Sequence, residues 1–290
     1  MKSIIISDID NTLYNFVNYF APCFRAMVHA LSKSTKISET TLTAAFRQVY
    51  ANHGSVEYRY AIEELHLFRA HPRDELEKLI NLGRVAFSRT ARHRLTPYPG
   101  VTDGLSWARA AGIPVIGFTN APLRYALWRL GQLGLSSYFT SIAAFEGHKE
   151  PRHIADNNTD QSLDELSQRY RSPIKRRIVL KEHELKPSPA GYKAILAAEH
   201  NKFDETYVIG DSQAKDLAPA MELGAIGIWA KYGTEFDSEN MDTLLQITPW
   251  TESKIRQAYD MDKQIEPDFT IEAFEEIQTF IPPRQLSIFG

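Results

Sequence analysis

The sequence predicts an α/β fold in which a Rossmann-like parallel sheet carries helices on both faces and an all-helical domain follows the first strand. One observation is that short apolar runs alternate with segments of helical periodicity from residue 96 onward. Such alternation favours right-handed crossovers and a parallel sheet. The other is that residues 15–95 show the helical period alone. We therefore expect a core domain of residues 1–14 and 96–290 and a helical domain of residues 15–95.

The spacing of apolar residues predicts the first strand and the helical domain. Residues 4–7 are typical of a buried strand, and apolar residues recur at helical spacing from Phe16 onward. The spacing predicts further helices near residues 39–51, 57–68 and 73–88. Pro72 is typical of a helix start, and the stretch TPYPG at 96–100 ends the helical domain.

The rest of the core is predicted as strands and helices in alternation. The expected strands span residues 113–119, 141–145, 206–211 and 225–230, and the expected helices span residues 122–133, 189–200 and 214–223. Residues 146–183 are polar and charged, which predicts an insertion with one helix at 161–170. The triplet KRR at 175–177 is typical of a solvated face.

Composition limits the classes of function. A chain of 290 residues, 43% of them hydrophobic, can bury a core as one large domain or two smaller ones. The single cysteine, Cys23, excludes an internal disulfide framework and fits a reducing compartment. The opening apolar run is too short for a signal peptide, and no stretch reaches the roughly 20 apolar residues of a membrane helix. We therefore expect a cytoplasmic protein with neither a membrane partner nor direct nucleic-acid binding.

Polar side chains suited to phosphate chemistry follow the expected strands. In an open parallel sheet, ligands bind beyond the carboxyl ends of the strands. The residues at those ends, and in the loop before the 189–200 helix, are Asp8, Asp10, Thr12, Thr119, Asn120, Lys186, Asp211, Ser212 and Asp216. Carboxylates suit Mg²⁺, and an aspartate can act as a nucleophile. The set predicts phosphoryl transfer, whereas a solvated strand end is the alternative for the first two carboxylates.

Four motifs resemble, in order, those of the haloacid dehalogenase-like superfamily. They are DIDNT at 8–12, GFTNA at 117–121, Lys186 in KPSP, and GDSQAKD at 210–216. The helical domain lies where that superfamily carries its first cap insertion, so we call residues 15–95 the cap domain. The first motif is most similar to that of pyrimidine 5′-nucleotidases. The dehalogenase branch is disfavoured, because its chemistry needs no proton donor at the position of Asp10.

The resemblance implies a nucleophile, an acid and base, and a metal site. Asp8 would attack the phosphorus and hold Mg²⁺. Asp10 would protonate the leaving oxygen and then activate water, with its backbone carbonyl also on the metal. Asp211 would complete the metal shell. The residues implied to support this site are Thr12, Ser212 and Asp216.

The resemblance also implies groups that bind the phosphate. Thr119 and the backbone amide of Asn120 would hold phosphate oxygens, and Lys186 would neutralise the charge of the transferred group. Lys149 is an alternative for the lysine role. Lys186 is favoured because the helix that the superfamily carries at this point follows it immediately.

The substrate is predicted less sharply than the chemistry. The cap domain has more basic than acidic residues, which suits an anion. A nucleoside 5′-monophosphate is the first expectation, and a phosphorylated small acid or sugar, such as phosphoglycolate, is the alternative. Candidates for substrate contact in the turn at 52–60 are His53, Tyr58 and Arg59, and the cap exit adds Arg89, Arg92, His93 and Arg94. Residues of these types are more often packing or surface residues.

The last residues carry a separate resemblance. Gln285, Leu286, Ile288 and Phe289 resemble the short peptide by which bacterial replication and repair proteins dock on the sliding clamp. Pro282 and Pro283 would hold this tail, residues 282–290, away from the core. The alternatives are a tail that packs on the core or is disordered. A non-catalytic adaptor that acts through the tail is the competing function of another class.

Overall fold

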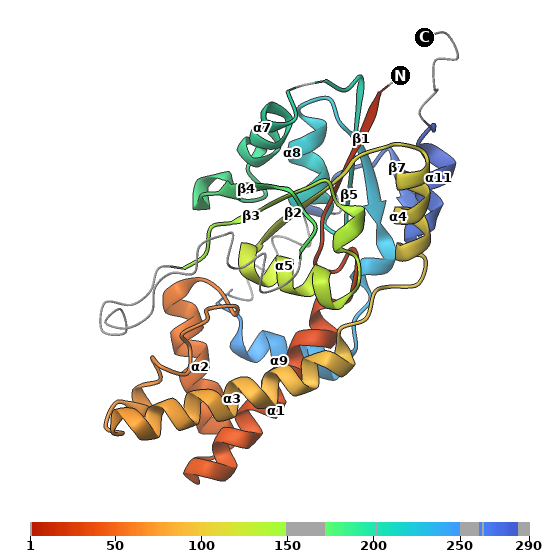
Figure 1. The fold of residues 1–290 in the computed structure, drawn as a ribbon. Coiled ribbons are helices and arrows are strands. Elements are labelled where there is room, and N and C mark those ends of the chain that lie inside the picture. Colours follow the sequence, from red (N-terminus) through yellow and green to blue (C-terminus); the bar gives the residue numbers. More distant parts are fainter. Residues whose placement is uncertain (1, 149–171, 201, 250–260, 263, 284–290) are drawn as a thin grey trace.

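The computed structural model describes residues 2–148, 172–200, 202–249, 261–262 and 264–283 (Figure 1). A parallel sheet forms the centre of the core, with strand order β4-β3-β2-β1-β5-β6-β7. The strands are β1 (Ser3–Ser7), β2 (Val115–Pro122), β3 (Ser141–Phe145), β4 (Arg176–Leu180), β5 (Glu205–Gly210), β6 (Ile226–Ala230) and β7 (Phe269–Ile271). The predicted α/β fold class is therefore confirmed.

Both faces of the sheet are covered, which explains why its strands are apolar runs. Ile4 and Ile6 of β1 point to one face, where they pack with residues of α7 and α8, while Ile5 points to the other. That second face packs against α4, α5 and α11 (Figure 1). The helices of the core are α4 (Val101–Ala110), α5 (Leu123–Gln132), α7 (Pro189–Ala198), α8 (Ala218–Met221) and α11 (Ile277–Phe280).

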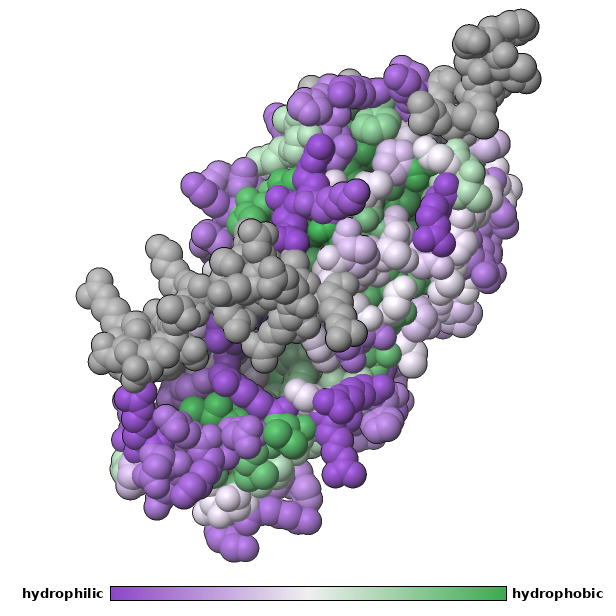
Figure 2. All heavy atoms as spheres, viewed as in Figure 1, coloured by the Kyte–Doolittle hydropathy of each residue, from purple (hydrophilic) through white to green (hydrophobic). Residues whose placement is uncertain are grey.

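Three long helices form the cap domain after β1. They are α1 (Phe16–Thr35), α2 (Glu39–His53) and α3 (Arg73–Arg94), and α1 lies along α3 (Figure 1). The Asn15 side chain begins α1 by accepting a hydrogen bond from the backbone amide of Asn18, at 2.8 Å. Figure 2 shows a surface on this domain that is hydrophilic for the most part and carries a smaller hydrophobic patch, shown in green.

The helix expected at 57–68 is wrong. Gly54 ends α2 at φ +66°, and turns follow as far as the short 3₁₀ helix His66–Phe68. Tyr58, Tyr60 and Leu65 are buried in the cap core from this irregular segment. Their apolar spacing therefore reflects a buried loop rather than a helix.

The interpretation of 146–183 as one insertion also needs correction. Residues Arg176–Leu180 form the edge strand β4, which pairs with β3 in parallel register. Arg176 at the start of the strand is exposed and Leu180 at its end is buried, so the strand runs from the surface into the core. The helix expected at 161–170 and Lys149 lie outside the described residues.

The chain after β6 adds an element that periodicity did not predict. Helix α9 (Ser238–Ile247) leaves the sheet and packs on α1 and α2 of the cap domain, before the chain returns to form β7 (Figure 1). The tail residues Gln285, Leu286, Ile288 and Phe289 lie outside the described residues, so docking on a sliding clamp stays a prediction. Within the described ranges, no helix combines the length and apolar character needed to cross a membrane.

Candidate active site

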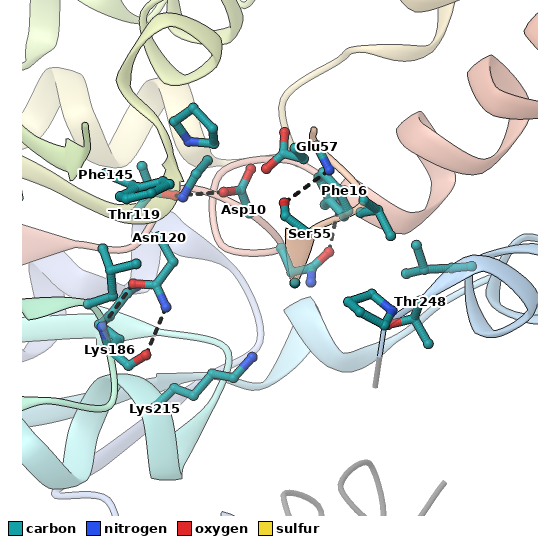
Figure 3. A pocket seen from close by; sticks show the side chains of 18 of the residues that line it. Asp10, Phe16, Ser55, Glu57, Thr119, Asn120, Phe145, Lys186, Lys215 and Thr248 are labelled. Atoms are coloured by element: carbon teal, nitrogen blue, oxygen red, sulfur yellow. Dashed lines mark hydrogen bonds between the residues drawn. The ribbon is translucent and has the colours of Figure 1, made fainter. Parts of the chain in front are cut away.

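The carboxyl ends of the central strands bring the predicted site residues to one edge of the sheet. Asp8 follows β1, Thr119 and Asn120 lie in β2, and Asp211 follows β5. Lys186 reaches the same edge from the loop before α7. Figure 3 shows Asp10, Thr119, Asn120 and Lys186 on the same side of a cavity. Segments far apart in the sequence therefore converge where an open parallel sheet binds its ligands.

A buried ion-pair network joins Lys186 to two carboxylates. Its Nζ contacts Oδ1 of Asp8, lies 2.6 Å from Oδ1 of Asp216, and donates to the carbonyl of Phe118 at 3.0 Å. The hydroxyl of Thr12 donates to the other oxygen of Asp8 at 3.1 Å. Both oxygens of Asp8 are therefore held, which orients this carboxylate within the site.

The network shifts the pKa values of its members. Burial raises the pKa of Asp8 to about 7. The charge of Lys186 lowers this pKa, and the charges of Asp216 and Asp10 raise it. Burial alone would lower the pKa of Lys186, but the carboxylates of Asp216 and Asp8 hold it well above its usual range. Burial, with the charges of Asp216 and Asp8, also raises the pKa of Asp211 well above its usual range. Because the pKa values of Asp8 and Asp211 are raised, a further cation bound beside them would stabilise their ionised forms.

Three carboxylates have the chemistry and spacing of a magnesium site. One oxygen each from Asp8, Asp211 and Asp216 can lie within 4.8 Å of the others. Mg²⁺ prefers such hard oxygen ligands and retains several waters. The residues present therefore fit this ion. The metal ligands predicted from the sequence were Asp8, Asp10 and Asp211. The carboxylate of Asp10 is not in the cluster, and Asp216 is. The backbone carbonyl of Asp10 therefore stays as the expected contact of this residue with the metal.

The motif GDSQAKD brings Asp216 under the end of β5. A π-helical turn, Gln213–Leu217, follows the strand, and the backbone amide of Ser212 donates to Oδ2 of Asp216 at 3.1 Å. A Cβ on Gly210 would lie 2.4 Å from the Cβ of Asp216, so only glycine allows this approach. The Ser212 hydroxyl donates to Asp262 at 3.0 Å, a partner that the sequence did not predict.

Asp10 is held by a different set of donors. Thr119 donates from its hydroxyl to Oδ2 of Asp10 at 2.7 Å. Arg129 donates from Nη1 to Oδ1 at 2.6 Å, and the Tyr14 hydroxyl contacts the same oxygen. Arg129 is buried on α5 and also contacts Glu57 of the cap domain. Sequence reasoning missed it, although its place three residues after buried Ala126 puts a charge on the apolar face of the helix.

Asn120 forms hydrogen bonds with the loop that carries Lys186. Its side-chain amide donates to the carbonyl of Lys186 at 2.8 Å and accepts from the backbone amide of Lys186 at 2.9 Å (Figure 3). The side chain thus fixes the main chain of Lys186. The expected contact of its backbone amide with phosphate stays a prediction.

A cavity of about 630 Å³ opens from these residues toward the cap domain. His53 lines it, stacks on Tyr58 with 3.5 Å between ring centroids, and pairs with Glu64 at 2.7 Å. Tyr58 and Arg59 are not among the lining residues: Tyr58 is buried with its hydroxyl on Glu64, and Arg59 lies over the ring of Tyr60. The exit cluster Arg89, Arg92, His93 and Arg94 is exposed and outside the lining.

Comparison with known proteins agrees with this fold. The model of a family described as haloacid dehalogenase-like hydrolase matches residues 2–224. The fold is similar to a HAD phosphatase from Thermococcus onnurineus, at 17% identity and TM-score 0.54, over 99% of this chain and 100% of that one. It is also similar to a 2-haloacid dehalogenase from Pseudomonas syringae pv. Tomato DC3000, at 16% identity and TM-score 0.52, over 96% and 97% of the two chains. No curated protein matches.

Proposed function

The chain belongs to the haloacid dehalogenase-like hydrolase family, and from this membership we propose that it is a Mg²⁺-dependent phosphatase of small phosphomonoesters. The observation that carries the proposal is the buried contact of Asp8 with Lys186 and Thr12. A carboxylate oriented in this way, beside an ammonium group that can neutralise a phosphoryl group, suits nucleophilic attack on phosphorus.

The proposed reaction has two displacements at phosphorus. An oxygen of Asp8 bonds to the phosphorus while the ester oxygen leaves and takes a proton from Asp10. Water then bonds to the phosphorus and gives a proton to Asp10, and the bond to Asp8 breaks to release phosphate. Asp10 must carry its proton in the first step and accept one in the second.

The described side chains hold the charges of this reaction. Lys186 stays between Asp8 and Asp216 and faces the developing negative charge. Asp8 and Asp211, with the carbonyl of Asp10, would hold Mg²⁺, which when bound supplies positive charge next to the phosphoryl oxygens. Asp216 lies close enough to support that ion or a water on it.

A nucleoside 5′-monophosphate is the first proposed substrate. Support comes from the likeness of the first motif to pyrimidine 5′-nucleotidases. It also comes from the cavity, which extends from Asp8 and Lys186 to residues of the cap domain. A phosphorylated small acid or sugar is the second proposal. The two differ in size and polarity of the leaving group, so a substrate screen separates them.

The test is phosphate release by the purified protein with Mg²⁺ and with a chelator. The panel holds nucleoside 5′-monophosphates, sugar phosphates and phosphoglycolate. We expect Mg²⁺-dependent release in the wild type and in the control Asp103→Asn, which changes an exposed carboxylate on α4, and none in Asp8→Asn. Equal release by Asp8→Asn would contradict the proposal.

A further inference from the structure

Helix α9 belongs structurally to the cap domain. Arg25 of α1 donates to Thr243 at 2.7 Å and to Asn240 at 2.8 Å, both on α9. Asn240 in turn donates to the side chain of Asn18 at 3.2 Å. These contacts join α9 to α1, although more than two hundred residues separate them in the sequence. The helix lies beyond residue 224, where the match to the family ends.

The residues just before α9 are hydrogen-bonded to the start of the same cap helix, α1. The Asn15 side chain donates to the carbonyl of Glu235 at 3.0 Å, and the backbone amide of Asp237 donates to Asn18 at 3.2 Å. Asp237 also caps α9 by accepting from the amide of Asn240 at 3.0 Å. The position of α9 is thus set by the cap domain.

One face of α9 forms an apolar end of the active-site cavity. Met241, Leu244 and Leu245 recur at helical spacing and line the cavity, and Leu245 is 40% exposed. Phe16, Val17 and Val56 of the cap domain line it as well. We call these six residues the apolar wall. In Figure 3, Phe16 and Thr248, which follows α9, lie across the cavity from Asn120 and Lys186.

The two ends of the cavity differ in chemistry. Charged groups of the sheet edge, including Asp8, Lys186 and Asp216, line one side of the cavity, and the apolar wall, beside Ser55 and Glu57 of the cap domain, lines the other (Figure 3). A ligand that fills both ends needs an anionic group joined to an apolar part. A small polar leaving group gains nothing from the apolar wall, because it has no hydrocarbon surface to remove from water.

We propose that the apolar wall is a subsite for a ring or hydrocarbon part of the leaving group, and that α9 thereby helps to select the substrate. The inference rests on the proposed function, since the phosphoryl group must lie at Asp8. The preferred substrates are phosphomonoesters with an aromatic or aliphatic leaving group, a class that includes a nucleobase ring. Phosphoglycolate, which is small and carries a carboxylate besides its phosphate, falls outside it.

The test combines hydrolysis with binding. Leu245→Glu places a carboxylate on the apolar wall at a half-exposed position, which spares the core. Val85→Glu is the matched control, because Val85 is 56% exposed on α3 and does not line the cavity. The hydrolysis substrates are 1-naphthyl phosphate and acetyl phosphate. The binding probes are 1-naphthylmethylphosphonate and methylphosphonate, which cannot be hydrolysed.

We expect Leu245→Glu to lower kcat/KM for naphthyl phosphate and the affinity for its phosphonate by about tenfold or more, as for other lost apolar pocket contacts. Both small compounds should stay within about twofold, and Val85→Glu should leave all four values unchanged. Naphthyl binding that is indifferent to Leu245→Glu overturns the subsite. A wild type that hydrolyses neither compound, yet binds the naphthyl phosphonate through Leu245, overturns the proposed function and supports the subsite.

Discussion

Arg129 donates a hydrogen bond from Nη1 to Oδ1 of Asp10, with 2.6 Å between the two atoms. The other terminal nitrogen of Arg129 contacts Glu57. One buried guanidinium therefore joins the proposed acid and base on the sheet edge to the cap domain. Its planar fork of donors suits two carboxylates at once. We expect Arg129 to position Asp10 and to stabilise the contact between cap and core.

Replacing this arginine should destabilise the protein. Arg129→Met keeps the length of the side chain but leaves Glu57 and Asp10 without a buried cation. Breaking a buried ion pair in this way costs about 3 kcal/mol of the free energy of unfolding, measured by urea denaturation. Arg73→Met removes an exposed pair with Glu77 and should cost less than about 1 kcal/mol. Equal losses in the free energy of unfolding of the two variants would contradict a stabilising role for the ion pairs of Arg129.

Asn120 should act through the position of Lys186. Asn120→Ala removes both hydrogen bonds to the main chain of Lys186, so the ammonium group loses its fixed position. A misplacement of this kind lowers kcat by about 10²-fold. The control Asn81→Ala changes an exposed residue of α3. Wild-type kcat in Asn120→Ala would mean that the loop keeps its position without these bonds.

Asp10→Asn should separate catalysis from metal binding. Loss of the proposed acid and base lowers kcat by about 10²- to 10⁴-fold. Mg²⁺ affinity, measured by calorimetry, should persist, because the Asp10 carboxylate is outside the carboxylate cluster and its backbone carbonyl remains. Loss of Mg²⁺ binding in this variant would place the Asp10 carboxylate on the metal instead.

The affinity for Mg²⁺ should rise with pH. The pKa of Asp8 is raised to about 7, so this carboxyl is largely protonated below that value and ionised above it. Mg²⁺ binds the ionised form and competes with the proton, which means that the dissociation constant falls as pH rises through about 7. Calorimetry in buffers of different ionisation enthalpy should also detect proton release. A dissociation constant that is flat between about pH 6 and pH 8 would exclude Asp8 as the titrating ligand.

The sequence predicted the parts of the site that follow from a parallel sheet. Asp8, Asp211 and Thr119 could be placed together because the carboxyl ends of parallel strands share one edge. Tertiary contacts decided the rest. The edge strand β4 begins with Arg176 and Arg177, and only its last three residues are apolar, so it lacks the longer apolar run of a central strand. The contact of α9 with α1 depends on side chains such as Arg25 and Thr243, which no local pattern joins.

The proposed mechanism requires that Asp8 becomes phosphorylated during turnover. The most direct measurement is acid quenching of the enzyme with substrate and Mg²⁺, followed by mass spectrometry of its peptides. We expect a phosphoryl group on the peptide that contains Asp8. It should disappear when the substrate is used up before the quench, and it should be absent from Asp8→Asn. Steady turnover without phosphoprotein, or a phosphoryl group on another residue, would contradict it.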